Sequence, residues 1–234
     1  MVLLAPAAAA VGARSIEGPR VGRSDGIGGG AAGPRVLTIA QLQYGGGGDW
    51  YANPSSLPNL LRVIRERTGL PVAERPAQVK LTDPALWNYP YLYLTGHGNL
   101  RLTEEEVGLL RRYLLAGGFL HADDNYGLDE SFRRELGRVF PDKQLVELPA
   151  DHPVYHVFYD FPRGLPKIHE HDGKPAQGFG ILHEGRLLVY YSYESDLGDG
   201  WEDADVHGDP PEIREQALRM GVNLFLYALA EVVS

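Results

Sequence analysis

The chain has 234 residues, of which 44% are hydrophobic and 23% are charged, which suits one folded domain with a full core plus a tail. Lys and Arg number 22 against 31 Asp and Glu, and the formal net charge of -9 argues against nucleic acid or an anionic membrane surface as the partner. The sequence contains no cysteine, which excludes disulfides, thiolate metal ligands and cysteine nucleophiles, so any chemistry must come from other side chains.

The first 34 residues differ in composition from the rest of the chain. The stretch MVLLAPAAAAVGA is apolar with small residues, which is typical of the end of a secretory signal, although the usual positive n-region is missing. Residues 14–34 are rich in Gly, Ser and Arg and carry too few large apolar groups to fold. We therefore expect residues 1–34 to be a signal-like or disordered segment and residues 35–234 to be a single domain. The signal interpretation places the protein in the periplasm or outside the cell, and the alternative places it in the cytoplasm.

Strands and helices alternate through the first half of this domain. The stretch 35–44 (RVLTIAQLQY) predicts a buried strand, and the stretch 57–68 (LPNLLRVIRERT) predicts a helix that ends just before Gly69. The stretches 91–94 (YLYL) and 117–124 (GGFLHADD) predict two further strands. This alternation predicts an α/β fold with a mainly parallel sheet and helices on both faces.

Capping signals locate the next two helices. Thr103 and Glu106 have the spacing of a capping box, and Gly117 follows the helix that this box would open. Asp129 is positioned to cap a third helix, which ends before Pro141.

The second half of the domain changes character. Residues 144–200 hold short strands and turns, including the hairpin-like HEGR, in which Gly185 can supply a left-handed turn. Asp209 can cap a long C-terminal helix that begins with two prolines. The apolar face of that helix is expected to belong to the core: Ile213, Ala217, Met220, Leu224 and Ala228.

Three loops that follow strands carry polar side chains, and ligands of open parallel sheets bind beyond these strand ends. The first loop contains four glycines, 45–48, but it lacks both the G-K-[ST] ending and the G-x-G-x-x-G spacing, and Asp49 would repel a phosphate. No nucleotide is therefore expected, and the glycines can simply permit a tight backbone path. Asp49, Trp50 and Tyr51 resemble the lining of a sugar or polyol site, with packing as the alternative role of the two rings.

The second and third loops, TGHGNL and HADDNYG, supply candidate catalytic residues. His97 lies between two glycines at a strand end, where it can act on a ligand or stabilise the turn. Alternation along the third strand sends His121 and Asp123 to one face, with Asp124 at the turn. Adjacent carboxylates repel, which raises one pKa or recruits a cation. The candidate catalytic residues are therefore Asp123, Asp124, His97 and His121, although one aspartate can instead be a cap.

Further polar side chains lie in the second half of the chain. His169 and His171 would point to one side of an extended stretch, which makes them a candidate pair for Zn or another divalent metal. The acidic run at 196–205 does not fit a calcium loop, because His207 and Arg214 occupy the fifth and twelfth positions of an EF-hand. The simpler interpretation of this run is a solvated loop.

Seven collinear motifs resemble the bacterial domain-of-unknown-function 4159 family. The motifs extend from about Arg35 to Ala230: YGGGGDWYANPSSLPNLL, YLYLTGHG, GGFLHADDNYG, HPVYH, GLPKIHEHDG, YYSYESDLGDGWED and ALRMGVNLFLYA. The resemblance implies a flavodoxin-like fold, close to the three-layer sandwich of class I glutamine amidotransferases. It also implies an envelope-associated setting with membrane-associated partner proteins. No biochemical activity comes with the family.

The amidotransferase-like fold implies where a site would lie. Asp123 or Asp124 stands where glutamine amidotransferases have their nucleophilic cysteine, so glutaminase activity through a thioester is excluded. The resemblance nevertheless implies that this turn, the His97 loop and the glycine loop converge on one cleft.

Three functions fit these observations. The first is a binding or regulatory module for a small polar, carbohydrate-like ligand, with Trp50, Tyr51, Tyr126 and Trp201 as apolar walls. The second is a hydrolase that uses an aspartate with His97 or His121, with or without a divalent metal. The third is a scaffold that docks a partner protein through an exposed apolar patch. By analogy of fold, the first function is preferred.

Overall fold

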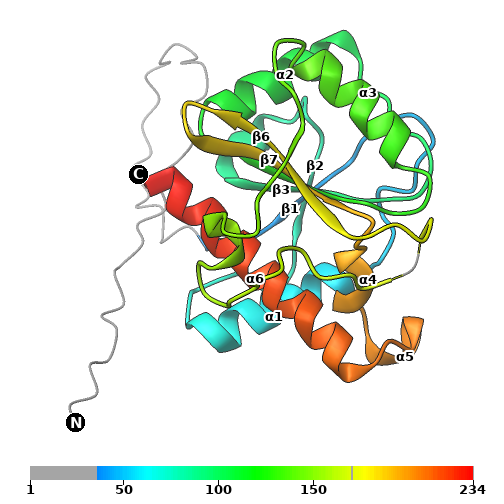
Figure 1. Ribbon diagram of the computed structural model, residues 1–234. Coiled ribbons are helices and arrows are strands. Elements are labelled where there is room, and N and C mark those ends of the chain that lie inside the picture. Colours follow the sequence, from blue (N-terminus) through cyan, green and yellow to red (C-terminus); the bar gives the residue numbers. More distant parts are fainter. Residues whose placement is uncertain (1–35, 170, 234) are drawn as a thin grey trace, which may run out of the picture.

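The computed structural model describes residues 36–169 and 171–233, so the expected signal-like segment lies outside the described residues. Seven strands form one sheet in the order β2-β1-β3-β4-β7-β6-β5 (Figure 1). The strands are β1 (Ala40–Leu42), β2 (Ala77–Val79), β3 (Tyr91–Leu94), β4 (Phe119–Asp123), β5 (Val146–Glu147), β6 (Gln177–His183) and β7 (Arg186–Tyr193). The strand β6 is antiparallel to both of its neighbours, β5 and β7, and the other strand pairs of this sheet are parallel. The predicted mainly parallel sheet is confirmed.

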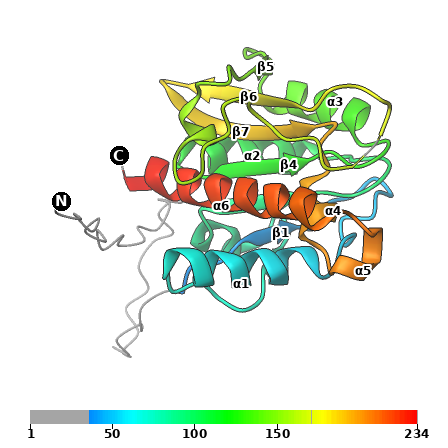
Figure 2. The same ribbon diagram turned by 60° about the horizontal axis from the view of Figure 1, so that its bottom comes forward.

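Helices cover both faces of the sheet. Figure 2 shows α1 (Ser56–Thr68) and α6 (Pro211–Val233) together on one face, with α2 (Glu104–Leu115) and α3 (Asp129–Val139) behind the sheet. The described residues also form short helical segments: η1 (Pro84–Asn88), η2 (Pro153–Tyr155), α4 (Leu197–Trp201) and α5 (Ala204–His207). No helix among the described residues combines the length and the apolar character that a membrane-spanning segment needs.

Alternation along the central strands explains why two separate cores form. In β3, Tyr91 and Tyr93 belong to the core under α1 and α6, whereas Leu92 and Leu94 belong to the core under α2 and α3. All four side chains are at most 1% exposed. A strand with both faces covered has no solvent-facing side, so its sequence is a continuous run of apolar residues.

Most of the expected helix ends are confirmed. Gly69 has φ of 70° and ends α1, and Thr103 with Glu106 forms the expected capping box of α2. The hairpin between β6 and β7 turns through Glu184 and Gly185, whose φ values are 51° and 83°. Two cap predictions were wrong. The helix α3 begins at Asp129, whose carboxylate accepts from the Tyr191 hydroxyl and from Arg133. The helix α6 begins at Pro211, two positions after Asp209, and Oδ2 of Asp209 has no hydrogen-bond partner among the described residues.

Candidate functional site

The loops that follow β1, β3 and β4 contact one another at one edge of the sheet. The carboxylate of Asp49 accepts hydrogen bonds from the backbone N–H of His97 and from its ring Nδ1, the latter at 3.1 Å. The backbone N–H of Gly98 donates to the carbonyl of Tyr126 at 3.3 Å. Asp49 therefore orients His97 in the loop after β3, and that loop in turn lies against the loop after β4.

The glycine loop packs against its neighbours too closely for larger residues. A Cβ atom on Gly46 would lie 2.6 Å from the backbone nitrogen of Arg101, and one on Gly96 would lie 2.4 Å from the Tyr44 hydroxyl. Gly46 has φ of 110° and Gly96 has φ of 135°, conformations that L side chains rarely adopt. These glycines permit close approach of two loops, which is the tight backbone path considered from the sequence.

Asp123 lies at the end of β4 and is fully buried. Its Oδ1 accepts from the Ser192 hydroxyl at 2.5 Å and its Oδ2 from the Tyr93 hydroxyl at 3.1 Å. The backbone N–H groups of Leu197 and Gly198, in the first turn of α4, donate to the same carboxylate at 3.1 and 2.6 Å. Burial raises the pKa of Asp123 to about 6. With both oxygens occupied by protein donors, Asp123 joins β4 to β7 and α4 and does not face a cleft as a nucleophile.

His121 is a core residue. Its ring is fully buried, with Nδ1 2.9 Å from the Tyr91 hydroxyl and Nε2 2.9 Å from the Ser192 hydroxyl. Burial lowers the pKa of His121 to about 3, so the imidazole is neutral at pH 7. The alternation that put His121 and Asp123 on one face is confirmed, but that face is covered by α6 and α4. The proposed catalytic role of His121 is therefore corrected to a structural one.

His171 and Asp196 form a buried pair next to this cluster. The Nε2 atom of His171 lies 3.0 Å from Oδ2 of Asp196, and its Nδ1 atom lies 4.0 Å from Oδ2 of Asp124. The side chains of His171 and Asp196 are 5% and 4% exposed. Burial, followed by the charges of Asp199 and Asp123, raises the pKa of Asp196 well above its ordinary value. Burial also raises the pKa of Asp124, which accepts from the Tyr191 hydroxyl and from the N–H of Glu194.

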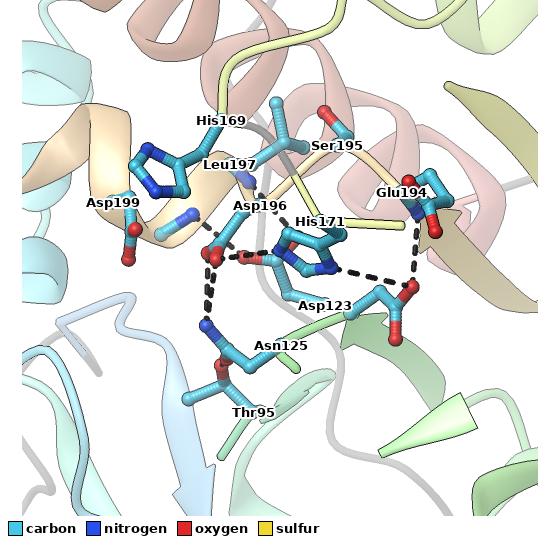
Figure 3. Close-up of polar contacts among 12 residues, drawn as sticks. Thr95, Asp123, Asn125, His169, His171, Glu194, Ser195, Asp196, Leu197 and Asp199 are labelled. Carbon is cyan, nitrogen blue, oxygen red and sulfur yellow. Dashed lines mark hydrogen bonds and ion pairs between the residues drawn. The ribbon is translucent and has the colours of Figure 1, made fainter. Parts of the chain in front are cut away.

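Asn125 holds the carboxylate of Asp196 in place. Its amide nitrogen donates to both Asp196 oxygens at 2.9 Å, while its carbonyl oxygen accepts from the Thr95 hydroxyl and the N–H of Gly96. Figure 3 shows this arrangement, with Thr95 and Asn125 on one side of Asp196 and His171 beside it. The loops after β3 and β4 thus determine where the Asp196 carboxylate points.

The turn from β7 into α4 has an unusual backbone. Glu194 and Asp196 both have φ of 56°, the left-handed region that non-glycine residues rarely occupy. Each such residue costs about 1 kcal/mol or more, and conformations of this kind concentrate at functional sites. Among the described residues, the turn after β4 contains no non-glycine residue with positive φ. The turn after β7 is therefore strained, whereas the turn after β4 is not.

A cavity of about 220 Å³ opens beside this turn, between the loop after β4 and the segment around His171. Its lining includes Tyr126, Tyr193 and Lys174. Five carboxylates also contribute to the wall: Asp124, Asp129, Glu130, Asp172 and Glu194. We call this cavity the acidic pocket.

The acidic pocket includes few of the candidate ligand-binding residues. Tyr126 lines it and is 67% exposed. Trp50 is half-buried against the core, and Tyr51 is exposed beside it with ring centroids 5.5 Å apart, but neither lines the acidic pocket. Trp201 is fully buried and its indole N–H donates to the carbonyl of Ala217, so its assignment as a ligand-binding wall is corrected to a core role.

The acidic run after β7 is also different from expectation. Asp196, Asp199 and Glu202 are at most 6% exposed, so the solvated-loop interpretation is wrong for these three, whereas Asp203 and Asp205 are exposed as expected. The Nδ1 atom of His207 lies 3.4 Å from Oδ2 of Asp199, and its Nε2 atom lies 3.3 Å from Oε2 of Glu202. These contacts connect α5 to α4.

The two imidazoles of the His-x-His motif do not form a metal pair. Figure 3 shows His169 beside Asp199 and His171 on the other side of Asp196. The Nδ1 atom of His169 lies 3.9 Å from Oδ1 of Asp209, a different partner from that of His171. Within residues 36–169 and 171–233, no group of three or more His, Asp and Glu side chains is arranged to hold a metal ion.

A larger cavity of about 920 Å³ lies between the glycine loop and the helices α2 and α3. Its charged groups largely neutralise one another, because Glu135 pairs with both Arg134 and Arg138. Arg138 also pairs with Glu104. This cavity lacks the buried acid–imidazole pair and the strained turn of the acidic pocket, so the acidic pocket is the stronger candidate site.

The comparisons with known proteins identify the family but not an activity. Residues 38–229 match the model of a domain of unknown function, DUF4159, so the chain belongs to this family. No curated protein sequence matches the chain.

Proposed function

We propose that this member of the DUF4159 family binds a small polar, carbohydrate-like ligand in the acidic pocket. The observation that carries the proposal is a cavity of about 220 Å³ whose wall combines five carboxylates with two tyrosines. Ligand pockets for drug-sized molecules occupy roughly 300–1,000 Å³, so this one suits a single sugar unit or a smaller polyol. The exposed ring of Tyr126 offers an apolar face to such a ligand.

The hydrogen-bonding character of the wall supports a ligand that is rich in donors. Ionised carboxylates only accept hydrogen bonds, and the amide of Asn125 already donates to Asp196. Lys174 is the one Lys or Arg among the described residues that line the pocket, and it donates to the Tyr193 hydroxyl at 2.9 Å. Hydroxyl groups of a neutral sugar, or an amino group, match this wall. A phosphate or carboxylate would meet like charge.

Glu130 is the pocket carboxylate best placed for a test. It is exposed and makes no hydrogen bond or ion pair within the described part of the chain, whereas Asp129 and Glu194 are tied to Arg133 and Lys167. Glu130→Gln therefore removes one charge from the pocket without releasing a buried partner.

The experiment is a calorimetric titration with glucose, glucosamine, glycerol and glucose 6-phosphate. Wild-type protein is expected to bind a neutral or amino sugar, and Glu130→Gln and Tyr126→Ala are expected to weaken that binding. Glu105→Gln, an exposed position on α2, is the matched control and should leave binding unchanged. Binding of the phosphorylated sugar alone, or equal affinity in all variants, would contradict the proposal.

Hydrolysis is the second candidate function, and the observation that favours it is the His171–Asp196 pair beside the pocket. Buried carboxylates with raised pKa values next to an imidazole are the kind of group that acid–base catalysis uses. From the sequence, this hypothesis used Asp123 or Asp124, assisted by His97 or His121. Asp123 and His121 are occupied in the core, so His171 and Asp196 replace them.

We also propose a fold family and a subcellular location for the protein. The strands β2, β1, β3, β4 and β7 have the spatial order of flavodoxin-like sheets, 2-1-3-4-5 when counted along the chain, which supports a class I glutamine amidotransferase-like sandwich. The signal-like composition of the first residues supports a periplasmic or secreted protein with membrane-associated partners. Export of the full chain fused to a reporter that is active only outside the cytoplasm would test this location.

A further inference from the structure

We infer that His171 is a general base and that the acidic pocket hydrolyses a small hydroxylated ester. This inference rests on the proposed function, because it concerns the same pocket and a ligand of the same polar class. A histidine ring has two different nitrogens, and the partner of one decides the state of the other. We assign the hydrogen to Nε2, which lies 3.0 Å from Oδ2 of Asp196, and this assignment leaves Nδ1 with a free electron pair.

The free nitrogen lies near Asp124, which is also part of the pocket wall. His171 lines the acidic pocket, and its Nδ1 has no hydrogen-bond partner among the described residues, with Oδ2 of Asp124 at 4.0 Å as the nearest charged atom. The side chain is 5% exposed, so a water or hydroxyl that reaches Nδ1 does so within the cavity. An imidazole oriented by a buried carboxylate and open on its other nitrogen is the arrangement of a general base.

The carboxylates of the pocket do not provide an alternative pair of catalysts. Glu194 is paired with Lys167 at 2.9 Å, and Asp129 is paired with Arg133 at 2.6 Å. Asp124 accepts from the Tyr191 hydroxyl and from a backbone N–H. Of the other two, Asp172 lies 3.9 Å from Nζ of Lys174, and Glu130 alone has no partner among the described residues. Glycoside hydrolysis needs two available carboxyl groups that flank one bond. The imidazole is available, which favours attack of water on an acyl group.

The reaction then balances without a further reactant. Nδ1 of His171 takes a proton from water while the water oxygen forms a bond to the ester carbonyl carbon. The bond from that carbon to the alcohol oxygen breaks, and the departing alkoxide takes the proton back from Nδ1. One ester and one water give one acid and one alcohol. The ammonium of Lys174, at the pocket wall, is the group placed to stabilise the developing negative charge on the carbonyl oxygen.

Asp196 and Asn125 act as positioning residues in this scheme. Asn125 fixes both oxygens of Asp196, and Asp196 fixes the tautomer of His171. The left-handed backbone of Asp196 is what turns its carboxylate toward His171, at a cost in stability that a purely structural turn would avoid with glycine.

The test measures hydrolysis of p-nitrophenyl acetate by the full chain, with wild type, His171→Gln, Asp196→Asn and His183→Gln. His183 lies at the hairpin between β6 and β7, at the far end of the sheet from the pocket, so His183→Gln is the matched control. Wild type should show saturable hydrolysis whose rate increases with pH, as general-base catalysis requires. His171→Gln should lower kcat by about 10²-fold or more and remove this pH dependence. Asp196→Asn should displace the pH profile.

Sugar binding by the same variants separates this inference from the proposed function. If wild type binds sugar but hydrolyses the ester no faster than His171→Gln, the general base is wrong and the binding site stands. If wild type hydrolyses the ester through His171 and binds no sugar, the general base stands and the proposed ligand class is wrong. Thermal unfolding of each variant identifies any loss of activity that comes from misfolding. If His171→Gln does not fold, an unchanged pH profile in folded Asp196→Asn would also overturn the inference.

Discussion

Nε2 of His171 and Oδ2 of Asp196 are 3.0 Å apart, although the two residues lie on different segments that approach each other only in the folded chain. Asp196 is held there by Asn125 and by its own left-handed backbone. The pair occupies the edge of the sheet where the loops after β3, β4 and β7 meet (Figure 3). The effect of these buried groups on the free energy of unfolding can be measured without knowing the ligand.

Asp196→Asn is expected to gain stability relative to wild type as the pH rises. Burial and two neighbouring carboxylates raise the pKa of Asp196, so the wild type loses stability as this carboxyl group ionises. Asparagine tolerates the left-handed backbone and removes the charge, but its amide nitrogen faces the amide nitrogen of Asn125, a cost that does not change with pH. Urea unfolding of both proteins at pH 5 and pH 8 measures the effect, and a stability difference that is the same at both pH values would contradict it.

Asp123→Asn is expected to destabilise the protein. An amide nitrogen in place of one carboxylate oxygen would face a donor, either a hydroxyl or one of the N–H groups of Leu197 and Gly198. A buried donor left without an acceptor costs about 1–3 kcal/mol. Urea unfolding of Asp123→Asn should therefore show a lower midpoint with an unchanged slope. A midpoint equal to that of wild type would show that α4 does not depend on this carboxylate.

The buried imidazole of His121 should make the protein sensitive to acid. Its pKa is lowered to about 3, so between pH 6.5 and about 3 the unfolded chain binds a proton that the folded chain does not. This group therefore stabilises the fold fully above pH 6.5, and its contribution falls by up to about 1.4 kcal/mol for each pH unit below it. Asp123, with its pKa raised to about 6, contributes the opposite slope between its ordinary value and pH 6.

Comparing wild type with His121→Gln isolates the histidine, because Asp123 is present in both proteins. The unfolding free energy, measured in urea at pH 7, 5.5 and 4.5, should fall with acid more steeply in wild type than in the variant. His121→Gln is expected to be less stable at pH 7, so only the difference in slope carries the test. Parallel slopes would contradict the neutral, buried imidazole.

Substitutions of two adjacent glycines can distinguish the cost of close packing from the cost of backbone strain in the glycine loop. Gly46 and Gly47 both have positive φ, 110° and 95°. A Cβ on Gly46 would lie 2.6 Å from the backbone nitrogen of Arg101, whereas one on Gly47 would meet nothing within 4 Å. Gly46→Ala should therefore lose about 1–3 kcal/mol more than Gly47→Ala. Chemical unfolding of both variants measures the difference, and equal losses would show that the loops are not closely packed.

The fold was largely predictable from the sequence because its signals are local. The capping box of Thr103 and Glu106, the helix end at Gly69 and the alternation in β4 each depend on residues a few positions apart. The cap at Asp129 was off by one position, since contacts with Tyr191 and Arg133, not a free helix end, decide where its carboxylate lies.

The candidate site was predictable only in its general location. Strand-end loops were the correct place to search, and the Asp49–His97 contact joins two of them. The sequence did not indicate that His121 and Asp123 lie under a helix, because solvent access depends on how α4 and α6 pack. Asp196 was assigned to a solvated loop because acidic runs are usually exposed, and its contacts with His171 and Asn125 span 25 and 71 positions. One signal was present, since the run ESDLGDG follows directly after a strongly apolar strand.

Mapping of backbone amide chemical shifts during a sugar titration tests the proposed binding site most directly. With glucosamine as the probe, the largest changes are expected at residues that line the acidic pocket, such as Tyr126, Gly127 and Asp172. Gly46 and Arg101, which line the larger cavity, should show little change. Changes confined to Gly46 and Arg101, or no saturable change at the acidic pocket with any of the sugars, would contradict the proposal.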